Sequence, residues 1–149
     1  MPRPAESPST SELPRGAVAV ITRADRFLVI RRSASVAAPR AFCFPGGHVE
    51  PGETESEALV RELREELGVL AQPIRRVWQS QTRWRVELSW WLTEVDPAAA
   101  LLPNAAEVES VHWLAPPEIL ALPELLDSNR DFLSLVAAGQ IVLSSHERG

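Results

Sequence analysis

The sequence predicts an α/β fold in which a mixed sheet is flanked by helices on both faces, within one domain. Two observations lead to this prediction. Short segments rich in apolar and β-branched residues recur along the chain, and longer segments carry the 3.6-residue apolar period of helices. Strands that surround one central helix, with another helix after them, favour a sheet covered on both sides. A length of 149 residues suits a single domain with one sizeable core.

The predicted strands begin after a polar segment at the N-terminus. Residues 1–14 are rich in proline and serine and predict a flexible tail, which leaves residues 15–149 for the domain. Apolar or alternating segments predict strands at residues 16–22, 26–32, 41–44, 74–80, 84–95 and 107–114, with residues 48–50 as a short strand or turn. The first two strands are separated by three residues, so we expect them to form a hairpin.

The tryptophans follow the alternating pattern of these strands. Trp84 and Trp90 share one side of the segment 84–95, so we expect both of them in the core, together with Trp113, in preference to the alternative that such rings stack on a ligand. Trp91 is out of phase with this side. It is therefore expected either in a second packed layer or in contact with a partner.

Local signals define the predicted helices. Thr54 and Glu57 have the spacing of a capping box, in which each side chain bonds the backbone N–H of the other residue. Gly68 is suited to the left-handed conformation that ends a helix, so we expect a helix from Thr54 to about residue 67. Further helices are predicted at residues 116–120 and 127–138, and a short strand or a docked tail at residues 141–143.

The composition excludes several classes of protein. A net charge of -5 and an isoelectric point near 5.2 argue against a broad basic surface for DNA. The single Cys43 rules out an intramolecular disulfide and favours a reducing, cytoplasmic location. No apolar segment reaches the length of a membrane span, and the N-terminus lacks the apolar core of a secretion signal. A small anionic substrate is compatible with this charge where a bound cation reverses the local field.

Three glutamates share one face of the central helix. Glu62, Glu65 and Glu66 are spaced i, i+3 and i+4, beside an apolar face that points to a core. Like charges at this spacing disfavour a helix, and a merely solvated face would normally alternate its signs. A cluster of hard oxygen ligands beside a buried face predicts a site for Mg²⁺ or Mn²⁺.

The glutamates belong to a longer pattern of fixed spacing. Between residues 47 and 69 the pattern contains Gly47, Glu53, Arg61, Glu62, Leu63, Glu65, Glu66, Gly68 and Val69, and Phe44-Pro45-Gly46 precedes it. This segment resembles the signature box of the Nudix hydrolases, of the MutT-like kind, with every specified position matched. The resemblance implies the α/β/α sandwich of that family. It also implies Mg²⁺- or Mn²⁺-dependent hydrolysis of a nucleoside diphosphate linked to another group.

The resemblance also implies roles for residues of the site. Glu62 and Glu66 would be the main metal ligands and Glu65 a further ligand or the general base, and the carbonyl of Gly46 would also ligate metal. Glu53 would pair with Arg61 and hold the loop against the helix, and Gly47 and Gly68 would be structural. A glutamate outside the box often joins such sites, and the candidates are Glu107 and then Glu109. Weaker candidates for binding substrate phosphate are Arg31, Arg32 and Arg40.

Two alternatives to a nucleotide hydrolase follow from the same pattern. Nudix-like domains also occur as nucleotide-sensing modules without turnover, although every carboxylate of the box is present here. The same chemistry is also used on diphosphates without a nucleoside. Because family members include monomers and dimers, a homodimer is possible. The expected partner is a small nucleotide or diphosphate substrate.

Overall fold

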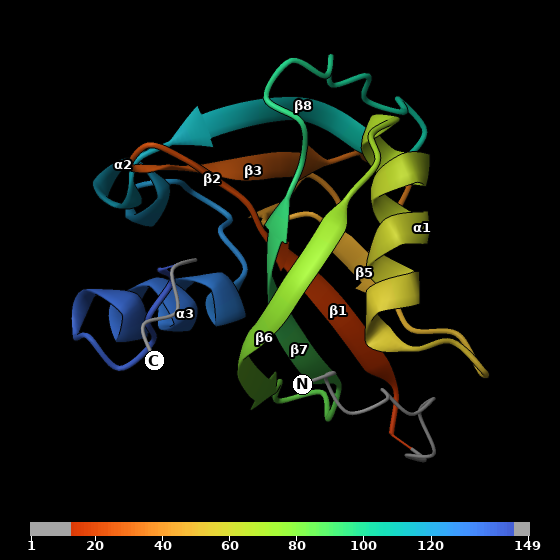
Figure 1. Cartoon of the computed structure of the whole chain (residues 1–149). Helices are drawn as coiled ribbons and strands as arrows, with labels where there is room; N and C mark the ends of the chain where they lie inside the picture. Colours follow the sequence, from red (N-terminus) through yellow and green to blue (C-terminus); the bar gives the residue numbers. More distant parts are fainter. Residues whose placement is uncertain (1–12, 145–149) are drawn as a thin grey trace, which may run out of the picture.

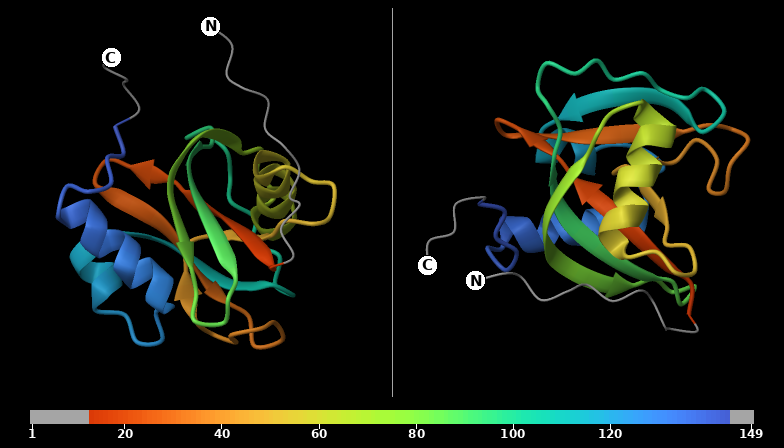
Figure 2. Two further views of the ribbon diagram at one scale, coloured as in Figure 1. Left: turned by 90° about the horizontal axis from the view of Figure 1, so that it is seen from below. Right: turned by 45° about the vertical axis from the view of Figure 1, so that its right-hand side comes forward.

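The computed structural model describes residues 13–144, so the predicted tail of residues 1–14 lies outside the described residues except for its last two. The strands form two four-stranded sheets. Helix α1 lies on one side of them, and helices α2 and α3 lie on the other (Figures 1 and 2). The predicted α/β class with a mixed sheet between helices is confirmed, although the strands divide between two sheets.

The first sheet is mixed and has the order β5-β1-β7-β6. Strands β1 (Arg15–Val20) and β7 (Glu87–Glu94) are parallel. Strands β5 (Gly46–His48) and β6 (Gln72–Gln81) pair antiparallel to β1 and β7, respectively. Strand β7 lies inside this sheet and is buried on both faces, so Trp90 and Trp91 both belong to the core. The two side chains point to opposite faces of the sheet, Trp90 into one core and Trp91 into the other. Of the two positions expected for Trp91, a second packed layer or a contact with a partner, the structure shows the first.

The second sheet is organised around β3 (Arg26–Arg32). Strands β2 (Thr22–Arg23), β4 (Phe42–Cys43) and β8 (Val108–Leu114) all pair antiparallel to it. The hairpin predicted for residues 16–22 and 26–32 therefore exists only at its closed end, where the short β2 pairs with β3. Strand β1 pairs in the other sheet instead, so the chain changes sheets after Val20.

Helix α1 (Glu55–Leu67) begins and ends where its local signals predict. The Thr54 hydroxyl accepts from the Glu57 N–H at 3.1 Å, and the Glu57 carboxylate accepts from the Thr54 N–H at 2.9 Å. Gly68 has a φ of 66°, the left-handed conformation that glycine adopts at low cost. The apolar face of α1 packs on the first core, which contains Leu59, Leu63, Leu67 and Trp91.

Helices α2 (Pro116–Leu120) and α3 (Asp127–Ala137) cover the opposite side. Phe132 of α3 is fully buried and stacks on Trp90 with ring centroids 4.8 Å apart, in the second core. The segment after α3 forms no strand within the described residues. Ile141 is buried there, so this segment docks on the core. Among residues 13–144, no helix is long and apolar enough to cross a membrane.

The expectation for Trp84 is wrong. Its side chain is 74% exposed, and it lies in the turn between β6 and β7, outside both strands. The alternating pattern continues through the turn in the sequence, but the hairpin closes at Thr82 and Val86, where the Thr82 N–H donates to the Val86 carbonyl at 2.9 Å. Trp113 is partly buried against the first core.

Candidate active site

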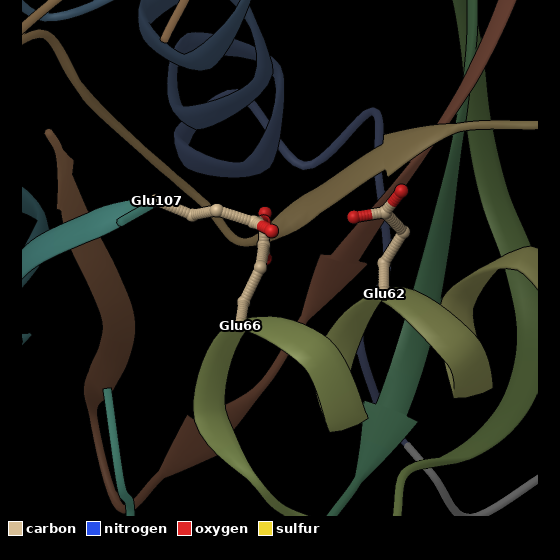
Figure 3. A group of neighbouring side chains, drawn as sticks. All are labelled: Glu62, Glu66 and Glu107. Atoms are coloured by element: carbon tan, nitrogen blue, oxygen red, sulfur yellow. The ribbon is translucent and has the colours of Figure 1, made fainter. Parts of the chain in front are cut away.

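Three carboxylates from two separate elements meet beside strand β5. Glu62 and Glu66 extend from adjacent turns of α1, and Glu107 comes from the residue before β8 (Figure 3). One carboxylate oxygen from each lies within 4.8 Å of the others. The backbone N–H of Gly46 donates to Glu66 at 3.3 Å, which places β5 against the same group. Glu66 is buried, and the other two are half-buried.

The pKa values of these carboxyls reflect burial and mutual repulsion. Burial, together with the neighbouring charges of Glu62 and Glu107, raises the pKa of Glu66 to about 8, against the opposing effects of the Gly46 N–H and of Arg32. Burial also raises the pKa of Glu62, although the adjacent Arg61 lowers it. The protein alone thus leaves these oxygens with an excess of negative charge. A hard divalent cation suits this donor set, because it prefers carboxylate oxygens and offsets their repulsion.

A β-bulge separates the two candidate glutamates around β8. In a regular strand Glu107 and Glu109 would face the same way. Consecutive residues of β3 instead pair with Val108 and Ser110, which leaves Glu109 as an extra residue. Glu109 lies 3.1 Å from the guanidinium of Arg40, while Glu107 joins the carboxylate group.

Glu65 lies outside this group of carboxylates. It is exposed, and its Oε1 accepts a hydrogen bond of 3.3 Å from Arg61. Arg61 also donates to Glu62 at 3.0 Å and to both oxygens of Glu53, at 2.6 and 3.0 Å. These bonds hold the pKa of the Glu53 carboxyl below its usual value. The paired Glu53 and Arg61 thus link the loop to the helix, in the arrangement expected from the sequence.

Gly47 allows the strand β5 to approach Glu62 closely. A Cβ atom at this position would lie 2.2 Å from the carboxyl carbon of Glu62. Any larger residue would therefore force the Glu62 side chain to move. Because Gly47 has no side chain, the backbone of β5 can pack directly against the Glu62 carboxylate of α1.

The three candidate arginines lie in different surroundings. Arg32 lines the cleft beside the carboxylates, and its Nε donates to the Ala37 carbonyl at 2.7 Å. Arg31 instead donates to Glu124 at 3.0 Å, and Arg40 pairs with Glu109. Neither Arg31 nor Arg40 lines the cleft. Only Arg32 is thus placed beside both the carboxylate group and the space next to it.

The cleft next to the carboxylates has a volume of about 700 Å³. Glu62 and Glu66 line it, together with Gly46 and Gly47 of β5. The turn between β6 and β7 supplies another part of the lining, which consists of Gln81, Thr82, Arg83, Trp84 and Val86. The start of α3 supplies a third part, with Asp127, Ser128, Asn129 and Asp131. A cleft of this size is in the range of about 300–1,000 Å³ typical of small-molecule sites.

Sequence reasoning missed Asn129, which helps to shape this cleft. Its side chain is buried, and its Oδ1 accepts a hydrogen bond of 2.9 Å from the Phe44 N–H. This bond ties the start of α3 to the segment that leads into β5. The two residues are 85 positions apart, so no local pattern in the sequence could have indicated it.

Glu55 was also missed, and it anchors the start of α1. Its carboxylate accepts hydrogen bonds from the Ser89 hydroxyl at 2.9 Å and from the Trp91 indole at 2.8 Å. It also pairs with Arg15, and Arg76 lies 3.5 Å away. These partners come from β1, β6 and β7. The helix that carries the clustered carboxylates is therefore fixed to the first sheet at its first residue.

Comparison with known proteins identifies the family. The NUDIX domain model matches residues 12–136 of the chain. The CTP pyrophosphohydrolase of Escherichia coli is 35% identical over 108 residues, which cover 70% of this chain and 78% of that protein. The NAD-capped RNA hydrolase NudC of Stutzerimonas stutzeri is 26% identical over 124 residues, or 83% of this chain. That match spans only 44% of the NudC protein.

Solved structures share the same fold. The crystal structure of a MutT protein from Methanosarcina mazei Go1 superposes with a TM-score of 0.72 and 24% sequence identity. The match covers 87% of this chain and 98% of that chain. The Nudix-type α/β/α sandwich expected from the box is therefore confirmed. The family match, the relatives and this fold lead to one conclusion: the chain belongs to the NUDIX domain family, as a MutT-like Nudix hydrolase.

Proposed function

We propose that this protein is a divalent-metal-dependent pyrophosphohydrolase that cleaves the diphosphate linkage of a nucleoside diphosphate derivative. The observation that carries the proposal is the group formed by Glu62, Glu66 and Glu107, whose oxygens lie within 4.8 Å of one another at a cleft. The charges of Glu62 and Glu107 raise the pKa of the buried Glu66 carboxyl. Such shifts between neighbouring carboxyl groups are typical of functional sites.

The ion of this site would be Mg²⁺ or Mn²⁺. Glu62, Glu66 and Glu107 would hold it, and Gly46, whose N–H already contacts Glu66, would add its carbonyl. When bound, such an ion neutralises charge on the diphosphate and lowers the pKa of a bound water. The donor set is composed of oxygen atoms alone, which favours these two ions over softer metals.

The protein's own residues supply the remaining parts of the reaction. Arg32 is placed to bind phosphate oxygens, because it alone of the three candidate arginines lines the cleft. A water oxygen attacks one phosphorus, the bond from that phosphorus to the bridging oxygen breaks, and the water proton is taken up by a carboxylate. We assign this last role to Glu65 because of its position in the Nudix box, and it lies one residue before Glu66, outside the carboxylate group and bonded to Arg61.

The relatives support a nucleotide as the substrate. The names of the two relatives described above specify CTP in one case and NAD-capped RNA in the other. Both contain a nucleoside and a phosphoric anhydride bond. We infer that the substrate of this protein is a small nucleotide derivative of the same kind, with the nucleoside held in the cleft beside the carboxylates.

The test combines turnover with metal binding. Nucleoside triphosphates, nucleotide sugars, dinucleotides and oxidised nucleotides would be screened with Mg²⁺ and Mn²⁺, and the products identified. On any substrate that is cleaved, Glu62→Gln, Glu66→Gln and Glu107→Gln should each lose several orders of magnitude in kcat. They should also lose the rise in melting temperature that the metal causes in the wild type.

Two further variants separate the roles. Glu65→Gln should lower kcat strongly but keep the metal-dependent rise in melting temperature. Glu109→Gln is the matched control, because Glu109 lies at the start of β8, two residues after Glu107, but pairs with Arg40, and the variant should retain most of the activity. Full activity of Glu66→Gln, or the absence of hydrolysis of every diphosphate by the wild type, would overturn the proposal.

A further inference from the structure

One tryptophan of the cleft is largely exposed to solvent. Trp84 has the largest exposed fraction, 74%, of the exposed large apolar side chains in the described part of the chain. Trp78, Trp90 and Trp91 of the neighbouring strands are buried or half-buried. Trp84 also lines the same cleft as Glu62 and Glu66. An indole in this position offers a large flat surface to whatever enters the cleft.

The turn that carries Trp84 is held in a defined conformation. The Thr82 hydroxyl accepts hydrogen bonds from the backbone N–H groups of Trp84 and Val86, each at 3.2 Å. The Arg85 N–H donates to the Thr82 carbonyl at 2.9 Å, and Arg85 has a φ of 63°. A left-handed residue at this place is typical of a short hairpin loop. The indole is therefore presented by a rigid turn, which lowers the entropy lost when a ligand binds it.

One face of the indole is already occupied by a cation. The Arg83 guanidinium lies over the Trp84 ring, 5.0 Å from its centroid. A second planar ring can therefore stack on the other face only. Both Arg83 and Trp84 line the cleft, so a ring stacked there would lie within it.

The rest of the cleft combines apolar and polar side chains, and Phe44, Leu88 and Trp90 belong to its apolar part. The start of α3 adds Asp127, Ser128, Asn129 and Asp131, which are polar or charged. A nucleobase has an apolar face for stacking and a polar edge for hydrogen bonds, and it can satisfy both parts of such a cleft. An alkyl chain would contact the apolar part of the cleft but would gain no hydrogen bond from these polar groups.

We propose that Trp84, backed by Arg83, is a stacking platform for the nucleobase of the substrate. This inference rests on the proposed function, since it assigns a place to the nucleoside of that reaction. Stacking tolerates every base, because each has an aromatic face. The platform therefore selects for substrates that carry a planar ring, and it discriminates against alkyl diphosphates. It acts on binding and leaves the chemical step at the carboxylates unchanged.

The test is a comparison of ligands with and without a base. Binding of the four common nucleoside monophosphates and of inorganic pyrophosphate would be measured by calorimetry in the presence of Mg²⁺. Trp84→Ala should weaken nucleotide binding by roughly 5- to 150-fold, and Trp84→Phe by only about threefold or less. Neither change should affect pyrophosphate. In turnover, Trp84→Ala should raise KM by a similar factor and leave kcat nearly unchanged.

Leu70→Ala is the matched control. Leu70 is 61% exposed and lies outside the cleft, so its removal also deletes an exposed apolar side chain but should change nothing. Three results would overturn the platform: nucleotide binding unaffected by Trp84→Ala, an equal loss for pyrophosphate, or an effect seen only with alkyl diphosphates such as geranyl diphosphate. A wild type that binds no nucleoside monophosphate would overturn it too.

The two proposals fail in distinguishable ways. If the wild type binds nucleotides through Trp84 but hydrolyses none, the proposed function is wrong and the platform stands. If nucleotides are hydrolysed and Trp84→Ala matches the wild type in both KM and binding, the platform alone is wrong.

Discussion

Glu55 and Glu66 lie on the same helix and are equally buried, at 5% exposure each, but their surroundings are opposite. Glu55 is satisfied by two arginines, a hydroxyl and an indole N–H. Glu66 meets one backbone N–H and the like charges of Glu62 and Glu107. A buried charge is stable where partners surround it. Glu55 shows that a buried carboxylate can have a purely structural role. Glu66 shows that a carboxylate buried beside other carboxylates is the better candidate for a functional site.

The largest expected effect is on stability and differs in sign between these two residues. Glu55→Gln leaves Arg15 and Arg76 facing a neutral amide, so it should cost about 3 kcal/mol of unfolding free energy. Glu66→Gln replaces a carboxyl that is costly to ionise in this place by a neutral amide, so it should leave the metal-free protein as stable as the wild type or more so. Urea unfolding without metal measures both. Equal losses for the two variants would mean that their surroundings do not differ as described.

A smaller effect, on activity, is expected from Gly47→Ala. The added Cβ would meet the end of the Glu62 side chain, which can rotate away at little cost in stability. The rotation removes Glu62 from the carboxylate group, so kcat should fall by about 100-fold. Gly52→Ala is the control for backbone strain, because a Cβ there meets nothing within 4 Å but the φ of 84° is unfavourable for alanine, so it should lower stability and leave kcat unchanged. Unchanged kcat in Gly47→Ala would show that the position of Glu62 is not critical.

The pH dependence of stability should distinguish the two glutamates further. The Glu66 carboxyl has a pKa of about 8 in the folded protein, against its ordinary value of 4.5 in an unfolded chain. Between these values the folded state holds a proton that the unfolded state has lost, so stability without metal should decrease as pH rises from about 4.5 to 8. The slope is at most about 1.4 kcal/mol per pH unit. Thermal unfolding of wild type and Glu66→Gln measures it, and the variant should show a flatter profile.

The smallest effect concerns the start of the helix beside Glu55. Thr54→Ala removes the hydroxyl that accepts from the Glu57 N–H, and it should cost about 1 kcal/mol. Because Glu55 still anchors the helix, the metal-dependent rise in melting temperature should persist. Chemical unfolding with and without Mg²⁺ checks both statements. A loss of the metal effect would indicate that the cap, rather than Glu55, positions the carboxylates.

Local signals explain why the helix could be predicted from the sequence and Glu55 could not. The bounds of α1 follow from residues next to its ends, Thr54, Glu57 and Gly68. The partners of Glu55 lie on three strands that are distant in the sequence. Its role therefore depends on packing, which no pattern within the helix reveals.

The carboxylates of the box and the fold family were predictable because they depend on fixed spacing. The sequence could not show which of Glu107 and Glu109 joins the carboxylate group, because the bulge that decides it arises from the pairing of β8 with β3. Trp84 was assigned to the core because its alternation with the strand continues into the turn. The place where a hairpin closes is decided by the hydrogen bonds of Thr82, and these are not visible in the alternation.

The bulge at Glu109 has a consequence for changes in chain length. The Glu107 carbonyl accepts from the Ser33 N–H at 3.0 Å, and Val108 begins the pairing with β3, so Glu107 is fixed from its C-terminal side. Insertions at residues 96–101 precede the bonds that Leu102 and Asn104 make to the end of α1, so they can be absorbed without moving this carboxylate. Deletion of Glu109 would restore a regular strand in which Arg31 still pairs with Ser110 and Arg32 with Val108, so Glu107 would keep its place. The third carboxylate of the site therefore tolerates the loss of the bulge, and only the contact between Glu109 and Arg40 would disappear.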